Sequence, residues 1–165
     1  MVHAGLEKFL YSIWQCVRNK EHDRLVSFLE TEERNFYRGK SAASSDVVHD
    51  YLHLKFPFSD GNKCSHDSAA ICGFTLLHLA AAVGSLHSTS LLLERGCDPN
   101  VSDCQNRTPL YYAAESGYLT VCITLLEKGA DINLLDCSVR RPFEYFPQGA
   151  FSAFASLLID FSCSS

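Results

Sequence analysis

The 165-residue sequence predicts an all-α fold: an α-solenoid of stacked helix-turn-helix units with short β-hairpin fingers, in a single domain over residues 1–165. Two adjacent segments of equal length carry the same residue pattern at an offset of 33 residues, without a gap. Each segment contains two stretches with the apolar spacing of amphipathic helices, followed by residues that favour turns. Helical apolar spacing also flanks these segments on both sides. A stacked array needs such degenerate caps, because a terminal unit has only one neighbour.

The first element, residues 4–30, is predicted to be an N-terminal helical cap. Apolar residues recur at helical spacing from Leu6 to Val17 and resume at Leu25, after a short polar break. The pair Cys16-Val17 takes the place that an alanine pair has in the repeated segments. This stretch is therefore expected to form two packed helices.

Residues 31–70 separate this cap from the first repeat and are predicted to form a long insertion loop. Residues 39–45 are polar and rich in small side chains, which favours a flexible run. Asp46 is placed to cap a short helix over residues 46–54, which the pair Phe56-Pro57 would end. The insertion is close to one unit in length, so a degenerate hidden repeat stays open as an alternative.

The two central segments, residues 73–105 and 106–138, are each predicted to fold as helix, turn, helix and finger. In the second segment Thr108 supplies an N-cap hydroxyl, and Pro109 takes the first helical position, where its missing N–H costs nothing. Gly117 ends the first helix in a conformation that residues with a Cβ resist. The strongest coincidences at the offset are Ala80-Ala81 with Ala113-Ala114, Gly84 with Gly117, Leu92-Leu93-Glu94 with Leu125-Leu126-Glu127, and Asp103-Cys104 with Asp136-Cys137.

These segments resemble ankyrin repeats. The runs from Thr75 to His78 and from Thr108 to Tyr111 resemble the T-P-L-H signature of that family, followed by Ala-Ala, Gly and a Gly-Cys/Ala-Asp-x-Asn close. Leu76 replaces the proline in the first run, and Tyr111 replaces the histidine in the second. The resemblance implies that this histidine ties adjacent repeats together through backbone hydrogen bonds. The hydroxyl of Tyr111 can still make a polar contact at the position of the histidine.

Residues 139–165 are predicted to form a degenerate C-terminal cap. Pro142 follows Pro109 at the repeat offset. Pro147 falls where the inner helix would carry an alanine, so this helix is expected to be short or bent. The apolar stripe from Phe154 to Phe161 predicts a closing helix.

Composition and charge exclude several classes of protein. Apolar residues make up 47% of the chain and charged residues 20%, which is typical of a globular domain. No apolar run is long enough to cross a bilayer, and Met1 to Lys8 show no secretory signal, so a membrane or secreted protein is disfavoured. The net charge is −5 and basic residues are scattered, which disfavours nucleic acid. We therefore expect a cytoplasmic and/or nuclear protein, monomeric alone, whose eight cysteines are all reduced thiols.

The resemblance implies a non-catalytic protein–protein interaction module, an adaptor or regulator that binds a partner protein through its concave surface of fingers and first helices. Apolar and arginine side chains at the implied contact positions supply the mixture that such binding needs. A substrate-recruiting adaptor of a larger enzyme complex is an alternative from the same resemblance. The implied contact residues are Phe74, Val83, Ser102, Cys104, Gln105, Arg107, Glu115, Ser116, Leu135, Cys137, Ser138 and Arg140.

A second class of function is a metal-binding regulatory protein organised by the insertion. His49 and His53 are four residues apart and would share a helix face, and Cys64, His66 and Cys72 follow. Such ligands suit Zn²⁺, but their spacing matches no closed site, so solvated loop residues are the alternative.

The sequence contains no motif that indicates a catalytic function. Nucleophile-elbow, phosphate-loop and metalloprotease motifs are absent, and we expect no enzyme activity and no cofactor. His78 is explained by the repeat signature. Asn133, with Leu125, Asp131 and Ile132 before it, resembles a substrate of an asparaginyl hydroxylase in this family; a silent structural role is the alternative.

Overall fold

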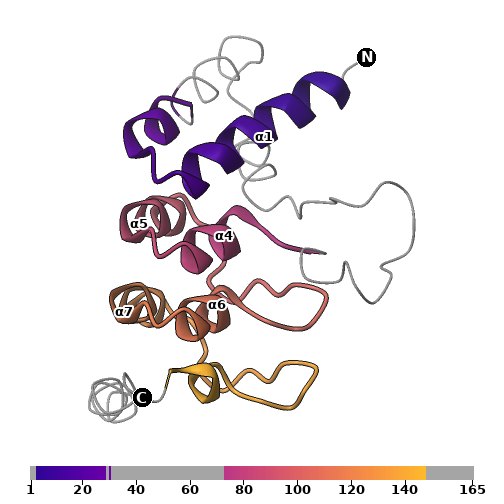
Figure 1. Ribbon diagram of the computed structural model, residues 1–165, viewed down its shortest axis with the longest axis vertical. Coiled ribbons are helices and arrows are strands. Elements are labelled where there is room, and N and C mark those ends of the chain that lie inside the picture. The colour runs from indigo at the N-terminus through magenta and orange to yellow at the C-terminus, as the bar shows by residue number, and fades with distance from the viewer. Residues whose placement is uncertain (1–2, 29, 31–72, 148–165) are drawn as a thin grey trace.

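Paired helices stack along one axis in the computed structural model, which describes residues 3–28, 30 and 73–147 (Figure 1). A helix over residues 22–28 follows α1. No β-strand occurs within the described residues, and none of their helices has both the length and the hydropathy to cross a membrane. The elements are α1 (His3–Arg18), α4 (Leu76–Ala82), α5 (Leu86–Glu94), α6 (Pro109–Glu115), α7 (Leu119–Glu127) and the 3-10 helix η2 (Pro142–Tyr145).

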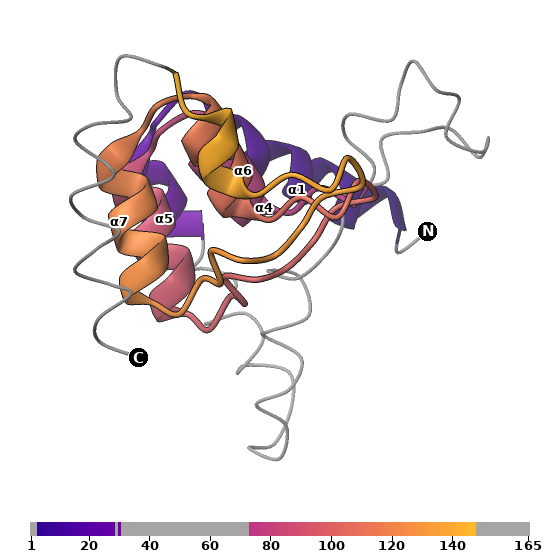
Figure 2. The same cartoon turned by 90° about the horizontal axis from the view of Figure 1, so that it is seen from below.

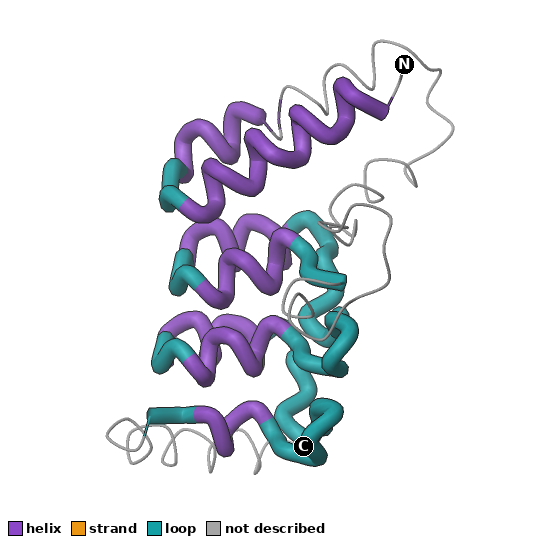
Figure 3. Tube along the Cα trace, turned by 45° about the vertical axis from the view of Figure 1, so that its right-hand side comes forward, coloured by secondary structure: helices purple, strands orange, loops and turns teal. Residues whose placement is uncertain are grey.

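The helices form two layers, with loops projecting from one side. Helices α4 and α6 lie in an inner layer, and α5 and α7 lie in an outer layer (Figure 2). Along the stack α1 packs on α4, α4 on α6 and α6 on η2, while α5 packs on α7. The long loops all leave the stack on the same side, and the short helix–helix turns lie at the opposite edge (Figure 3). The predicted all-α solenoid is confirmed.

Small side chains let the inner helices approach closely. Ala80 and Ala81 of α4 are fully buried, and so are their counterparts Ala113 and Ala114 of α6, which are at most 1% exposed. A short side chain in a close-packed interior brings two backbones together without leaving a void. The core between the layers is completed by Leu76, Leu77, Leu92, Leu110, Val121, Cys122 and Leu125.

The N-terminal helices continue this stack. Cys16 and Val17 are buried at 2% and 0% exposure, as expected from their alignment with the alanine pairs. The turn between α1 and the helix over 22–28 passes through Lys20, whose φ of 58° lies in the left-handed region. Gly84 takes the matching position in the next unit, with φ of 68°. A Cβ there would lie 2.6 Å from ring carbons of Tyr118, so this turn requires glycine.

His78 joins the first repeat to the second. Its Nδ1 accepts a hydrogen bond from the Thr75 backbone N–H at 3.1 Å and lies 2.9 Å from the Thr75 hydroxyl. Because Nδ1 is an acceptor, the proton lies on Nε2, which donates to the Arg107 carbonyl at 3.0 Å. The ring is fully buried. It therefore fixes the start of α4 and the next finger at once.

Tyr111 makes the corresponding link from the second repeat to the third unit. Its hydroxyl donates to the Leu134 carbonyl at 2.7 Å and also lies within hydrogen-bond distance of the Arg140 carbonyl. Burial raises the pKa of Tyr111 to about 12, so the hydroxyl keeps its proton and remains a donor at neutral pH. The substitution of tyrosine for histidine thus preserves the link between units.

The substitution of tyrosine for histidine at position 111 leaves the Thr108 hydroxyl without the ring nitrogen that its counterpart Thr75 contacts. Thr108 begins α6 with an extended backbone, but its buried hydroxyl has no hydrogen-bond partner among the described residues. In α4 the corresponding Thr75 hydroxyl meets the His78 ring nitrogen, and a tyrosine ring has no nitrogen to offer. The prediction of an N-cap hydroxyl at Thr108 is therefore wrong, although the helix begins where expected.

This difference between the two threonines predicts opposite effects of the same mutation. Thr108→Val replaces an unpaired buried hydroxyl by a methyl group of similar shape, and we expect it to stabilise the protein by roughly 1 kcal/mol. Thr75→Val removes a paired hydroxyl and is expected to destabilise by roughly 1 kcal/mol. Thermal unfolding followed by circular dichroism measures both. A loss of stability in Thr108→Val as large as that in Thr75→Val would contradict the assignment.

The fingers differ from the β-hairpins that the sequence predicts. Each is a tight turn closed by two backbone hydrogen bonds. In the first finger the Asp103 N–H donates to the Arg107 carbonyl at 3.0 Å and the Asn106 N–H donates to the Asp103 carbonyl at 3.2 Å. In the second the Asp136 N–H donates to the Arg140 carbonyl at 3.1 Å and the Val139 N–H donates to the Asp136 carbonyl at 3.0 Å. Other N–H groups of the turn bond to the aspartate carboxylate, so they are not available for a strand ladder.

The third unit begins its inner helix at Pro142, as the repeat offset from Pro109 predicts. Its inner helix is the short 3-10 helix η2, which ends before Pro147. The predicted helices over residues 46–54 and from Phe154 to Phe161, and the question of a hidden repeat in 31–70, lie outside the described residues.

Candidate protein-interaction site

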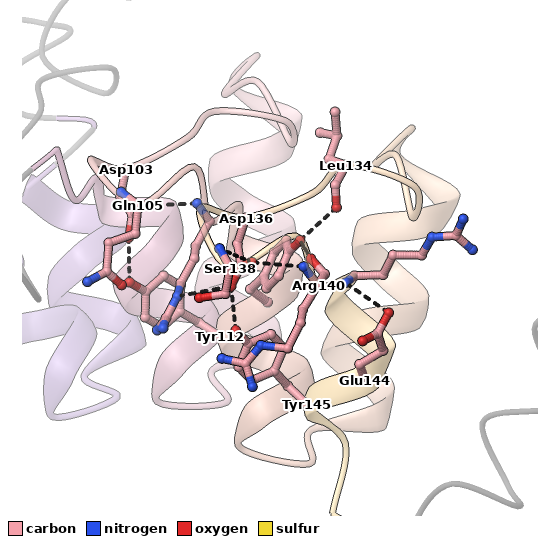
Figure 4. Close-up of polar contacts among 12 residues, drawn as sticks. Asp103, Gln105, Tyr112, Leu134, Asp136, Ser138, Arg140, Glu144 and Tyr145 are labelled. Atoms are coloured by element: carbon pink, nitrogen blue, oxygen red, sulfur yellow. Dashed lines mark hydrogen bonds and ion pairs between the residues drawn. The ribbon is translucent and has the colours of Figure 1, made fainter.

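The first finger, residues 101–107, is organised by the Asp103 carboxylate. Its Oδ1 accepts hydrogen bonds from the backbone N–H groups of Gln105 at 2.7 Å and Arg107 at 2.9 Å. Its Oδ2 accepts a hydrogen bond from the Tyr112 hydroxyl on α6 at 2.6 Å (Figure 4). Asp103 is 6% exposed, and its buried charge is balanced by these donors. The finger is thereby tied to the inner helix behind it.

The second finger, residues 134–140, repeats this arrangement around Asp136. Oδ1 accepts from the N–H groups of Ser138 at 2.8 Å and Arg140 at 3.0 Å, and Oδ2 accepts from the Tyr145 hydroxyl on η2. Burial raises the pKa of the Asp136 carboxyl, but the hydrogen bonds from Tyr145, Arg140 and Ser138 outweigh it and hold the pKa below its ordinary value. The Asp136 carboxylate is therefore ionised at neutral pH.

The two fingers are joined to each other by a hydrogen bond and a long ion pair. The Cys137 N–H donates to the Gln105 carbonyl at 2.9 Å, and the Arg107 Nε lies 3.9 Å from Asp136 Oδ2. At the far end of the loops the Asn100 side chain bridges to the next turn, accepting from the Asp131 N–H at 2.7 Å and donating to the Gly129 carbonyl at 3.0 Å. Neighbouring loops are thus fixed side by side, and their exposed side chains form one surface.

A family model of ankyrin repeats, in three copies, matches residues 14–136, which is well over half of the chain. The chain belongs to the ankyrin-repeat family. Ankyrin repeats generally mediate protein–protein interaction, and ankyrin-repeat proteins are typically non-catalytic. No curated protein matched the chain.

Most of the residues expected to contact a partner lie at the surface of this ankyrin stack. We use the name finger face for the inner surface that carries the two fingers and, at its other edge, the C-terminal end of α6. Val83, at the end of α4, is half-buried and lies near that edge, where the Ser116 hydroxyl donates to the Ala82 carbonyl at 3.3 Å. On the finger face the exposed residues are Cys104, Glu115, Ser116, Leu135, Cys137, Ser138 and Arg140, and the half-buried ones are Ser102, Gln105 and Arg107.

Phe74 is the exception among the expected contact residues. Its side chain is 8% exposed and packs against the rings of His78 and Tyr112, with ring centroids 5.2 and 5.0 Å away. The expectation that Phe74 offers apolar area to a partner is therefore wrong. Its position directly before α4 places the ring against the inner helices, which the repeat pattern alone does not reveal.

The cysteines also need a correction. Cys16, Cys97 and Cys122 are buried free thiols and Cys137 is an exposed one, but Cys104 is disulfide-bonded. The expectation that all eight cysteines are reduced is wrong at Cys104. An argument from compartment gives only a general tendency, and whether one sulfur forms a disulfide depends on a second sulfur within reach in the fold.

Two further candidate sites are a zinc site in the insertion and a hydroxylation site at Asn133. The proposed zinc ligands His49, His53, Cys64, His66 and Cys72 lie outside the described residues, within which no group of three or more metal-binding side chains occurs. Asn133 is exposed in the loop after α7, and its N–H donates to Asp131 Oδ1 at 2.8 Å. Its hydroxylation stays a prediction.

Sequence reasoning missed Val139 of the finger face and Tyr145 of η2, whose ring contacts it. Val139 is 73% exposed at the turn of the second finger, and the Tyr145 ring lies beneath the side chains of Arg107 and Arg140. The sequence could have indicated both residues, because at the offset of 33 residues Val139 aligns with Asn106 of the first finger and Tyr145 aligns with Tyr112.

Proposed function

We propose that this chain is a non-catalytic adaptor or regulator that binds a partner protein through its finger face and the adjoining inner-helix ends. The hydrogen bond between Cys137 and Gln105 carries the proposal, because it fixes two successive fingers as one surface. A rigid surface loses little conformational entropy on binding, so more of the contact energy appears as affinity.

The proposed contact residues are the exposed and half-buried ones of the finger face, together with Val83. Leu135 contributes apolar area at 46% exposure, and Arg140 and Glu115 contribute charged groups. A few central residues carry most of the energy in protein interfaces, so we expect only some of this set to matter strongly. Two fingers form a small surface, for which modest affinity is expected. The proposal includes a monomer in isolation and a location in the cytoplasm or nucleus.

A pair of matched double variants tests the finger face. Leu135→Asp with Glu115→Lys alters exposed finger-face residues, and Leu86→Asp with Glu127→Lys makes the same changes on the outer helices α5 and α7. Leu86 is 43% exposed, close to the 46% of Leu135. Quantitative mass spectrometry after affinity purification is expected to show at least about a tenfold loss of partner for the finger-face variant, the effect of losing one strong contact.

The outer-helix variant is expected to recover partners at the wild-type level. Thermal unfolding of both proteins checks that the finger-face variant remains folded. Equal recovery by wild type and both variants would show that the finger face is not the binding surface.

A further inference from the structure

Two arginines from successive units converge on one tyrosine ring. The Arg107 guanidinium carbon lies 5.5 Å from the centroid of the Tyr145 ring, and that of Arg140 lies 4.2 Å from it. Figure 4 shows Arg140 and Tyr145 together beside Asp136, on the second finger and η2. A guanidinium held over an aromatic face is attracted by the ring and loses part of its side-chain freedom. The free protein therefore already restrains these cations.

The two arginines differ in the carboxylates available to them. The Arg107 Nε is buried and lies 3.9 Å from Asp136 Oδ2, which is too long for a hydrogen bond. The Arg140 side chain is exposed, and within the described part of the chain no carboxylate lies in ion-pair distance of its guanidinium. Both oxygens of Asp136 are already bonded to Ser138, Arg140 N–H and Tyr145. Arg140 thus presents its planar set of donors to solvent.

An apolar residue in a costly conformation lies next to this cation. Val139 has φ of 58°, in the left-handed region, and is 73% exposed. The matching residue of the first finger is Asn106, with φ of 56°. Asparagine tolerates this conformation and a β-branched residue does not. Because the Val139 side chain is mostly in solvent, packing within the chain does not explain an apolar group at this turn. Leu135, in the same finger, is also exposed.

We propose that the second finger binds an extended protein segment in which an acidic side chain lies close to an apolar one. A carboxylate of the segment forms a bidentate pair with Arg140, with the charge of Arg107 nearby, and its apolar side chain packs on Val139 and Leu135. The net charge of −5 opposes the approach of a nucleic acid, so a short acidic segment fits better than a polyanion. This inference rests on the proposed function and specifies the chemistry of the partner.

Selection from a phage library of short random peptides on the intact chain provides the probe. The enriched peptides are expected to carry Asp or Glu within a few residues of a large apolar side chain. Fluorescence anisotropy on one such peptide then compares wild type with Arg140→Gln, which we expect to bind about tenfold more weakly. Arg141→Gln, on the neighbouring exposed arginine, is the matched control and is expected to change the affinity less than about twofold. A Glu→Gln version of the peptide should lose as much affinity as Arg140→Gln.

Val139→Asn adds a readout that separates binding from folding. Because it installs the residue that the first finger has at this turn, we expect the melting temperature to rise by about 2–4 °C. The same variant is expected to bind the selected peptide at least about fivefold more weakly, because an exposed apolar contact is lost. A higher melting temperature with unchanged affinity would remove Val139 from the site.

The possible failures are distinguishable. Enriched peptides without acidic residues, whose binding is lost in the Leu135→Asp with Glu115→Lys variant, would overturn the acidic partner and leave the finger face as the binding surface. Peptides whose binding is insensitive to every finger variant would count against both proposals. If no peptide is enriched, an extended segment as the ligand is overturned, while recovery of folded partners by affinity purification still tests the proposed function.

Discussion

Replacing His78 by alanine is expected to destabilise the protein by about 4 kcal/mol, from lost hydrogen bonds and a new cavity. The Thr75 backbone N–H and hydroxyl lose their common acceptor, and the Arg107 carbonyl loses its donor. The imidazole is fully buried and contacts the rings of Phe74 and Tyr112, so its removal also leaves an unfilled volume. Urea unfolding followed by circular dichroism measures the change as a shift of the transition midpoint.

His87→Ala is the matched control. His87 lies on the outer helix α5, is exposed, and makes an edge contact with the ring of His22 at a centroid distance of 4.9 Å. Its loss is expected to cost less than about 1 kcal/mol. Tyr111→Phe removes only the hydroxyl that links the second and third units, and an intermediate loss of about 2 kcal/mol is expected. Similar stabilities of His78→Ala and His87→Ala would disprove the linking role of His78.

The repeat offset predicted most of the stack because its constraints are local. The alanine pairs and the glycine at each helix turn specify where an inner helix packs and where it ends, and these positions appear directly in the sequence. Aligning Cys16-Val17 with the alanine pairs extended the same reasoning to the N-terminal helices, where both residues are buried. Tyr111 kept the polar link expected of the histidine that it replaces, since the phenol also reaches the next loop.

Features that depend on contacts between units could not be predicted in the same way. Whether Phe74 is a core ring or a surface ring depends on Tyr112, which comes from the following unit. Arg107 was expected to be a contact residue, yet its Nε is buried near Asp136, at the end of the same unit, and its guanidinium lies over the ring of Tyr145 of the third unit. Both outcomes are decided by a neighbour that residue type and spacing do not identify. The unpaired hydroxyl of Thr108 is different, because it follows from Tyr111, three positions later in the same unit, which has no ring nitrogen to offer.

Asp136→Ala is expected to destabilise the protein by about 3 kcal/mol, because hydrogen bonds to a buried carboxylate are lost. Asp136 is 5% exposed and is the acceptor for the N–H groups of Ser138 and Arg140 and for the Tyr145 hydroxyl. All three donors would be left without this acceptor, and the Arg107 Nε would lose a carboxylate that lies 3.9 Å away. Asp131→Ala is the control. Asp131 is exposed, and its carboxylate accepts one hydrogen bond from the described part of the chain, from the Asn133 N–H, so its loss should cost less than about 1 kcal/mol.

The pH dependence of the melting temperature separates the stability contributed by the charge of Asp136 from that contributed by the packing of its side chain. The pKa of the folded carboxyl lies below its ordinary value, so ionised Asp136 stabilises the native state above the unfolded pKa. That contribution is lost as the pH falls through the folded pKa. The melting temperature of the wild type is therefore expected to fall between about pH 5 and pH 3, and the fall should be smaller in Asp136→Ala. Parallel curves for the two proteins would mean that the hydrogen-bonded carboxylate contributes no charge-dependent stability to the second finger.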